Sequence, residues 1–256
     1  MSHLSSVTSG ITVGHGRAGL VEASGGSRFV HHYVALPAGS TWYAVNGAVA
    51  FPRATHSGGI SWTVLGGRDG VTRLLGRLAD PGVIVGRTLS ITLPRQLEPL
   101  LHNRFRLGAG SSWEWLWTTE APLVPPRSDL LQKLGAAELE EIAAFLPDHS
   151  PQAIHHRATD AEWFALRLRD GSLGAVGAYS AGQGAGYLSS LAVSAQLRGR
   201  GLGRLLTAYL TDRGVREQGL CTLAVYSDNE VARSLYTSLG YKTEWQLASR
   251  AVVCLR

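Results

Sequence analysis

The sequence predicts an α/β (α+β) fold, and three observations in its second half support this prediction. Two strand patterns, over residues 162–169 and 173–180, flank Asp170-Gly171, a dipeptide typical of a tight β-hairpin. A third strand, at residues 187–193, leads through a glycine-rich loop into a helix over about 203–218. With the helix expected before the hairpin and a strand after the long helix, the predicted order is α-β-β-β-α-β.

The other elements follow from hydrophobic periodicity and from start and stop signals. Leu139, Ile142 and Leu146 recur on one helical face, which predicts a helix. Gly240 is a typical stop signal for the helix before it. In the second half, helices are predicted over 130–134, 139–146 and 229–239, and strands over 221–226 and 242–255. In the first half, strands are predicted over 43–51, 60–65, 83–87 and 111–119, and helices over 71–79 and 94–105.

The clearest domain boundary is the proline-rich segment 122–128, because prolines favour an extended connector. It separates an N-terminal domain over 26–121 from a C-terminal domain over 129–256, and the Ser- and Gly-rich residues 1–25 are expected to form a flexible segment. The two domains show nearly the same order of predicted elements, which indicates a degenerate internal repeat. In the first domain, only Gly66-Gly67-Arg68-Asp69-Gly70 stands where the second has its glycine loop.

Composition argues against several classes of function. The chain has 256 residues and a formal charge of +5, but its basic residues are scattered, without the basic block of a nucleic-acid-binding surface. No apolar run approaches the ~18 residues of a membrane span, and no secretory leader pattern is present, so a cytoplasmic protein without membrane contact is expected. Cys221 and Cys254 are too few for a disulfide framework, and the paired histidines lack metal-ligand spacing, so no metal site is expected.

The glycine-rich loop has the composition of a phosphate-binding site. Glycines let backbone N–H groups turn toward one point, and the start of the helix adds unpaired donors and a positive dipole end. Arg198, Arg200 and Arg204 lie in the same stretch. A plain tight turn is the alternative for such a pattern taken alone. The spacing Gly-x-Gly-x-Gly disfavours a Rossmann loop, and the lack of Gly-Lys-Ser/Thr disfavours a P-loop.

Two spaced segments carry a family resemblance. Arg198-Gly199-Arg200-Gly201-Leu202-Gly203 fits the pattern Gln/Arg-x-x-Gly-x-Gly/Ala, and residues 229–241, NEVARSLYTSLGY, are similar to Asn-x-x-Ala-x-x-Leu-Tyr-x-x-Leu-Gly-Phe. Through these segments the sequence from Ser128 onward resembles the GCN5-related N-acetyltransferase (GNAT) superfamily, most closely its FR47-like acyltransferase branch. The resemblance implies a mixed, mostly antiparallel central sheet flanked by helices, with the N-terminal domain as a degenerate second copy.

The resemblance also implies acetyl-CoA as the co-substrate and indicates how it is held. Backbone groups at the end of the third strand would pair with the pantetheine arm, much as an added strand would. The loop N–H groups would hold the pyrophosphate, one or more of the three arginines would meet phosphate charge, and Asn229 would fix the cofactor near its thioester. The predicted cofactor-binding residues are Leu191, Ala192, Val193, Arg198, Gly199, Arg200, Gly201, Leu202, Gly203, Arg204 and Asn229.

Tyr236 matches the general acid of the family. Its phenol, with a pKa near 10, would protonate the departing thiolate of CoA. No Asp or Glu occurs between Gly171 and Leu197, so the carboxylate that many relatives carry on this strand is absent and the general base stays open. The candidates are Ser189 and Ser190 acting through water, Glu162, His155 and His156.

We therefore expect an N-acetyltransferase that moves an acyl group, preferentially acetyl, from acetyl-CoA to a primary amine by direct attack. The acceptor is a small molecule, an amino acid or a peptide. The missing carboxylate leaves open an alternative, an acyl-CoA-binding sensor or regulatory protein that has lost turnover. The expected partners are acetyl-CoA and the amine acceptor, with neither nucleic acid nor membrane, and the chain is expected to act as a monomer or homodimer.

Overall fold

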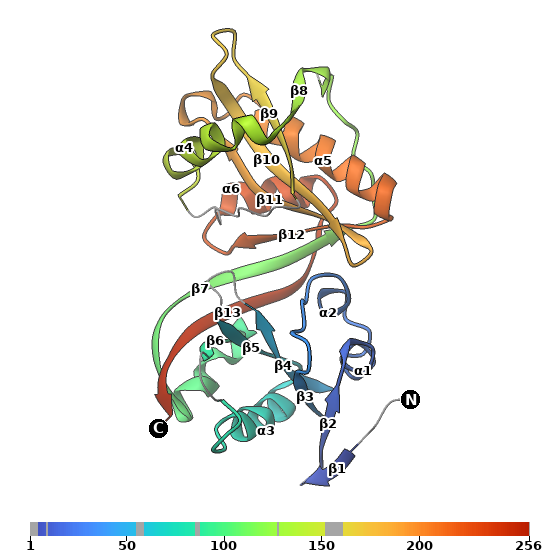
Figure 1. The fold of residues 1–256 in the computed structure, drawn as a ribbon, viewed down its shortest axis with the longest axis vertical. Coiled ribbons are helices and arrows are strands. Elements are labelled where there is room, and N and C mark those ends of the chain that lie inside the picture. The colour runs from blue at the N-terminus through green and yellow to red at the C-terminus, as the bar shows by residue number, and fades with distance from the viewer. Residues whose placement is uncertain are drawn as a thin grey trace. The chain divides into compact units, whose positions relative to one another are not determined.

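The computed structural model describes residues 5–8, 10–54, 59–84, 88–126, 128–151 and 161–255. The chain forms two compact units, and near the C-terminus short segments return to the first of them (Figure 1). The predicted division at 122–128 stays a prediction, because these units are defined by contacts rather than by independent folding. The first unit consists of Met1–Glu114, Tyr226–Asp228 and Glu244–Arg256, and the second consists of Trp115–Val225 and Asn229–Thr243.

The first unit is built around one sheet, with α3 on one of its faces. Residues 10–25, which lie within the segment expected to be flexible, contain a strand and a helix, and Leu20 in that helix is fully buried. The unit comprises β1 Ser5–Thr8, β2 Ile11–His15, α1 Arg17–Ala23, α2 Arg28–His32, β3 Thr41–Val45, β4 Ala48–Ala54, β5 Ile60–Leu65, α3 Arg68–Leu78, β6 Thr88–Pro94, the 3-10 helix η1 Arg95–Asn103 and the first part of β7 Phe105–Thr118.

The second unit holds the predicted motifs. Its hairpin turns at Asp170-Gly171 as predicted, with Gly171 at φ 87°. The unit comprises the 3-10 helix η2 Ser128–Leu130, β8 Leu131–Leu134, the 3-10 helix η3 Ala136–Glu138, α4 Leu139–His149, β9 Glu162–Arg167, β10 Leu173–Gly182, β11 Ala185–Val193, the 3-10 helix η4 Ala195–Leu197, α5 Leu202–Gln218, β12 Cys221–Tyr226, α6 Glu230–Ser238, the end of β7 and the start of β13 Lys242–Leu255.

Both units have the same strand topology. In the first, β2, β3, β4 and β5 pair antiparallel in that order, and β5 pairs parallel with β6. In the second, β8, β9, β10 and β11 pair antiparallel in that order, and β11 pairs parallel with β12. A helix follows the fourth strand of each series, α3 after β5 and α5 after β11. The shared topology supports the internal repeat, which the sequence showed only faintly.

Each series of paired strands continues into a strand from the other half of the chain. In the first unit β13, the C-terminal strand, pairs antiparallel with β6. In the second unit the neighbour of β12 is β7, which belongs by sequence to the first half. The first series thus pairs with the C-terminal strand, and the second with a strand that begins in the first half of the chain. The mixed, mostly antiparallel sheet with flanking helices confirms the predicted fold class.

In the second unit, the sheet separates two apolar layers. Leu205, Leu206 and Leu210 of α5 pack with Leu188 and Leu223 on one face. Ile142 and Leu146 of α4 pack with Trp163, Val176 and Ala178 on the other face. Because side chains alternate along a strand, β10 supplies Tyr179 to the first layer and Ala178 to the second.

Three local predictions were wrong. Residues 130–134 form a 3-10 turn and the edge strand β8, because so short a segment cannot sustain a helix and β9 offers it a pairing edge. The strand predicted at 83–87 lies instead at 88–94, with residues 85–87 outside the described part. Within the predicted helix 94–105, Arg95–Asn103 forms a 3-10 helix containing Pro99, whose missing N–H disfavours a regular α-helix.

The strand predicted over 43–51 is interrupted by a hairpin. Asn46 and Gly47 adopt φ values of 49° and 72° between β3 and β4. Two successive positive φ values are typical of a type I′ turn, which Asn-Gly favours. The dipeptide is a signal in the sequence that the strand prediction overlooked.

Candidate acyl-CoA site

A β-bulge interrupts β11 shortly before its end. Val176 of β10 pairs with Ala192, but Ala178 pairs with Ser189, so β11 has one residue more than its partner over this stretch. At the bulge, Ser190 adopts φ 52°, a left-handed conformation that is uncommon outside glycine. The bulge changes the direction of the strand just where the predicted cofactor-binding residues begin.

The pairing between β11 and β12 covers only the first part of β11. The parallel register runs from Gly186↔Cys221 to Leu188↔Leu223, although both strands continue beyond it. Leu191 and Val193 direct their side chains into the layer against α5, and Ala192 lies in the layer against α4. With its side chains packed in the two cores, this part of β11 presents its backbone edge toward the side of β12.

The loop after β11 is open and rich in left-handed glycine conformations. Gly199 and Gly201 have φ values of 76° and 79°, and a Cβ atom built on either would meet nothing within 4 Å. Gly201 is the N-cap of α5. The Leu205 N–H donates to the Gly201 carbonyl at 3.0 Å. The N–H groups of residues 202–204 precede this bond and therefore have no acceptor within α5. These free N–H groups lie at the positive dipole end of α5, and the first turn of α5 contains no acidic residue.

The three arginines of the loop differ in their contacts. The Arg198 Nη2 donates to the His149 carbonyl at the end of α4, at 2.8 Å, and the Arg204 Nη1 donates to the Ser238 hydroxyl at the end of α6, at 2.7 Å. Arg200 is exposed, and the described residues offer its guanidinium no partner. Arg198 and Arg204 thus tie the loop to two helices, and Arg200 is the arginine available to a ligand.

His149 adds a second contact between α4 and the loop. Its Nδ1 lies 3.4 Å from the backbone N of Ala195, which follows the end of β11, and its ring stacks near Phe145 with centroids 4.3 Å apart. Together with the Arg198 bond, this holds the C-terminal end of α4 against the start of the loop.

The second motif lies on α6, next to the loop. The Asn229 Oδ1 caps α6 by accepting the Ala232 N–H at 3.1 Å, which leaves the side-chain amide group for another partner. A Cβ on Gly203 would lie 3.6 Å from Val193 Cγ2 and 3.8 Å from Leu235 Cδ2. The end of β11, the start of α5 and the helix carrying Tyr236 therefore meet at Gly203.

Tyr236 is buried, with 7% of its surface exposed. Burial raises the pKa of its phenol, so the side chain is a neutral hydrogen-bond donor at physiological pH. Its ring lies 5.9 Å from that of Tyr241, whose hydroxyl hydrogen-bonds the Thr211 hydroxyl at 2.8 Å and the Cys221 Sγ at 3.3 Å. Burial likewise raises the pKa of the Cys221 thiol to about 11, so it is not a nucleophile at neutral pH.

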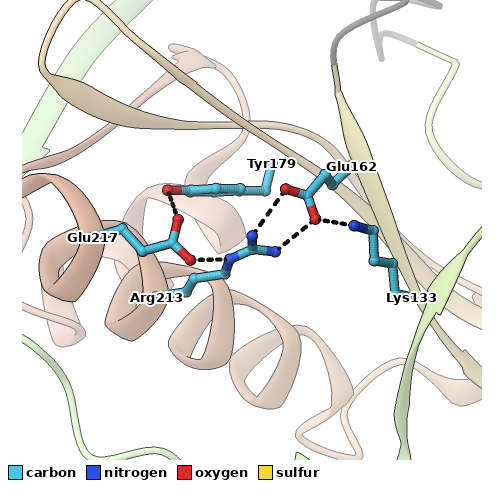
Figure 2. Close-up of polar contacts among 5 residues, drawn as sticks. All are labelled: Lys133, Glu162, Tyr179, Arg213 and Glu217. Carbon is cyan, nitrogen blue, oxygen red and sulfur yellow. Dashed lines mark hydrogen bonds and ion pairs between the residues drawn. The ribbon is translucent and has the colours of Figure 1, made fainter.

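Of the predicted base candidates, Ser189 and Ser190 lie at the bulge, whereas Glu162 is engaged elsewhere. Glu162 belongs to a network on β8, β9, β10 and α5, shown in Figure 2. Both of its oxygens bond the Arg213 guanidinium, at 2.9 and 3.0 Å, and one also bonds the Lys133 Nζ at 2.6 Å. These partners lower the pKa of Glu162 and keep it ionised. His155 and His156 lie outside the described residues.

The rest of that network was not anticipated from the sequence. Glu217 accepts from the Arg213 Nε at 2.7 Å and from the Tyr179 hydroxyl at 2.8 Å, and Arg213 lies over the Tyr179 ring, 4.6 Å from its centroid (Figure 2). The i, i+4 spacing of Arg213 and Glu217 on α5 was the available signal. Its links to β8, β9 and β10 depend on tertiary contacts.

The second unit is thus an α/β domain with a mixed sheet and an open glycine loop at a helix N-terminus. The model of the Acetyltransferase (GNAT) family matches residues 129–241. These residues therefore form a GNAT acetyltransferase domain, which confirms the superfamily resemblance and supports acyl transfer from an acyl-CoA in general terms. The FR47-like branch stays a prediction. No curated protein matches the sequence.

Solved structures share the fold over most of the chain. A Drosophila protein is 15% identical with a TM-score of 0.60, covering 92% of this chain and 86% of its own. A GCN5-related N-acetyltransferase from Sphaerobacter thermophilus is 13% identical with a TM-score of 0.59, covering 96% and 97%. One from Kribbella flavida is 19% identical with a TM-score of 0.53, covering 94% and 97%. At these identities the likeness establishes the fold alone.

The described part of the chain contains no helix long and apolar enough to cross a membrane. In the same residues, no three His, Cys, Asp or Glu side chains gather in a way that could hold a metal ion.

Proposed function

We propose that the second unit transfers an acetyl group from acetyl-CoA to a primary amine of a small molecule, an amino acid or a peptide, in a cytoplasmic setting. The observation that carries this proposal is the convergence of three features. The bulged end of β11, the open glycine loop and the start of α5 lie together, and Leu235 of α6, the residue before Tyr236, reaches the same point at Gly203.

The loop suits the diphosphate of CoA. Backbone N–H groups of residues 199–204, two left-handed glycines and a helix N-terminus offer several donors to one anion without any side chain. Of the arginines, Arg200 is the one proposed to meet phosphate charge, because Arg198 and Arg204 already bond protein groups.

The bulged part of β11 suits the pantetheine arm. Beyond Leu188 the strand edge is not in register with β12, so the amides of the arm pair with the backbone of Leu191 to Val193 as an added strand would. This pairing would place the thioester beside β11. The side-chain amide of Asn229 is proposed to hold the cofactor near that end.

Tyr236 is proposed to stabilise and protonate the leaving thiolate. Burial raises the pKa of its phenol, which keeps the proton on the oxygen for donation to the thiolate and also makes this phenol a weaker acid than a free tyrosine. The attacking amine must lose a proton. With Glu162 held by Arg213 and Lys133, we assign this step to water near Ser189 and Ser190.

A thiol-release assay with acetyl-CoA and a panel of amines tests the proposal. We expect release with at least one amine, and a loss of about 10²-fold or more in kcat for Tyr236→Phe, with little change in acetyl-CoA affinity. Unchanged turnover in this variant would remove Tyr236 from its role.

The same assay separates the second candidate function, acyl-CoA sensing without turnover. That function is favoured by the absence of Asp and Glu between Gly171 and Leu197, the stretch of sequence that leads into the glycine loop. Tight acetyl-CoA binding by calorimetry without release from any amine would establish it and overturn the enzyme proposal.

A further inference from the structure

Tyr241 follows the helix that carries Tyr236, and its backbone is bonded to that residue. Gly240, in the left-handed conformation at φ 88°, ends α6. The Gly240 N–H donates to the Thr237 carbonyl and the Tyr241 N–H donates to the Tyr236 carbonyl, each at 3.1 Å. These two bonds form a Schellman motif, in which the residue after the glycine often packs against the residue whose carbonyl it bonds. Here that contact joins the two tyrosine rings, whose centroids are 5.9 Å apart.

The hydroxyl at position 241 departs from the family pattern. The pattern that residues 229–241 resemble ends in Gly-Phe, whereas this chain has Gly240-Tyr241. Tyr241 is buried, with 4% of its surface exposed. A buried hydroxyl costs free energy unless it is hydrogen-bonded, and phenylalanine would place the same ring there without that cost. The hydroxyl therefore needs partners, and these partners constrain the ring more than packing alone would.

The Tyr241 hydroxyl has two partners on other elements of the second unit. It is hydrogen-bonded to the Thr211 hydroxyl of α5 at 2.8 Å and donates to the Cys221 Sγ of β12 at 3.3 Å. Thr211 and Cys221 are both fully buried. Burial also raises the pKa of the Tyr241 phenol, so this side chain is neutral at physiological pH. The bonds at the hydroxyl and the backbone bond to Tyr236 therefore hold Tyr241 at both ends.

Thr211 is itself held by hydrogen bonds along α5. Its hydroxyl donates to the Thr207 carbonyl at 2.7 Å, and the Thr207 hydroxyl donates to the Gly203 carbonyl at 2.7 Å. Gly203 lies at the start of α5, beside the open glycine loop. The rise of an α-helix places Thr211 about 12 Å from Gly203 along the axis. One helix therefore supplies N–H groups to the loop and, at a fixed distance, the side chain that holds Tyr241.

The Tyr236 hydroxyl has no comparable anchor. Among the residues that the structure describes, no group is hydrogen-bonded to it. A general acid must direct its proton at the leaving atom, and a misplacement of about 1 Å can cost 10²-fold in rate. The direction of the Tyr236 phenol is therefore set by α6 and by the side chains packed against its ring, of which Tyr241 is one.

We propose that Tyr241 and Thr211 are positioning residues for Tyr236: the hydrogen bond between them holds the Tyr241 ring, and that ring holds the Tyr236 phenol in one orientation. This role rests on the acid function proposed for Tyr236. All three residues belong to the second unit, so the orientation is set before any cofactor binds. A purely structural role for the same hydrogen bond predicts lower stability without a specific effect on the acid.

Steady-state kinetics of the full chain test this role through non-additivity. Tyr241→Phe should lower kcat about 3- to 10-fold and leave the KM for acetyl-CoA unchanged. In a Tyr236→Phe background the same change should have no further effect on kcat, because no acid remains to be positioned. An equal loss in both backgrounds, or an unchanged kcat in Tyr241→Phe alone, would overturn the positioning role. Unchanged kcat in Tyr236→Phe would instead refute the acid function on which this role rests.

A second readout does not require turnover. In protein labelled with ¹³C at tyrosine Cε, the Tyr236 resonances are identified by their loss in Tyr236→Phe. A ring that is held in place flips slowly and gives two Cε resonances, one for each edge, whereas a mobile ring gives one averaged resonance. We expect two resonances in the parent and one in Tyr241→Phe. One averaged resonance in the parent, or two in both proteins, would overturn the proposal.

Two further variants control for folding and for the loss of a buried hydroxyl. Thr211→Val removes the other half of the bond and should reproduce both results, and it decides if Tyr241→Phe does not fold. Thr222→Val is the matched control, because Thr222 is buried on β12 and its hydroxyl donates to the Gly186 carbonyl at 3.2 Å. It should lower the melting temperature but leave kcat and the two Tyr236 resonances unchanged. A loss of kcat equal to that of Tyr241→Phe would show a general effect of core destabilisation and contradict the proposal.

Discussion

The two units share one strand topology but use their glycines in opposite ways. In the first unit, a Cβ on Gly66 or Gly70 would lie 2.5 Å from the Ala48 Cβ, so these glycines allow α3 to pack closely against β4. In the second unit, Gly199 and Gly201 face open space and take left-handed conformations. The difference teaches that a glycine-rich turn before a helix becomes an anion site only when its backbone is exposed.

Two further differences point the same way. The β4–β5 register is unbroken from Val49↔Leu65 to Ala54↔Ile60, whereas the β10–β11 register contains the bulge at Ser190. The first turn of α3 also carries Asp69, which opposes a bound phosphate, and the first turn of α5 has no acidic residue. The first unit therefore has the frame of the second without its open glycine loop.

The strongest test of this contrast changes the open glycines. The double variant Gly199→Ala, Gly201→Ala should weaken CoA binding about 10-fold or more, because alanine resists the left-handed conformation by about 1–2 kcal/mol per residue and the N–H groups turn away. Calorimetry with CoA measures the effect. Gly67→Ala is the matched control, since Gly67 has φ −76° and open space around it. Unchanged CoA affinity in the double variant would refute the role of the loop.

Gly70, which is closely packed against β4, should affect the stability of the protein and not its binding of CoA. In Gly70→Ala, the new methyl group would lie 2.5 Å from the Ala48 Cβ and 2.9 Å from the Val45 carbonyl oxygen. We expect a loss of about 1–3 kcal/mol in unfolding free energy, measured by urea denaturation, with unchanged CoA affinity in the folded protein. A variant as stable as the parent would show that α3 does not need this close approach.

Two arginines of the open loop should differ in the same way, with Arg200 affecting CoA binding and Arg204 affecting stability. Arg200→Gln should weaken CoA several-fold, by about 1 kcal/mol, and the effect should shrink at high salt, because an exposed charge is screened. Arg204→Gln should lower the melting temperature through loss of its bond to Ser238, with a smaller effect on CoA. Equal effects of both variants on CoA affinity would contradict the division of roles.

The smallest expected effect concerns the ion network of the second unit. The hydrogen bonds from Arg213 and Lys133 lower the pKa of Glu162, so the stability it adds is present above its unfolded pKa of about 4.3 and is lost as pH falls through its folded value. Glu162→Gln should reduce stability by about 0.5–1 kcal/mol at neutral pH. The difference from the parent should shrink in acid, and a constant difference across thermal melts at several pH values would contradict this account.

Local patterns predicted much of the second unit. Asp170-Gly171 fixed the hairpin, β12 spans the predicted 221–226, and Asn229 caps the helix predicted from its motif. The same reasoning failed where tertiary pairing overrode local preference. Leu131–Leu134 is a strand only because β9 lies beside it, and a four-residue segment has little preference of its own.

By itself, the sequence determined the loop, the helix starts and the order of the elements, because glycine conformation, capping and periodicity act within a few residues. Only the tertiary structure decided three further features: the bulge at Ser190, the pairing of β13 with β6 and of β7 with β12, and the bonds of Arg198 and Arg204 to helix ends. Each depends on a partner distant in the chain. The physical reason is that strand register and side-chain pairing are set by the packing of whole elements.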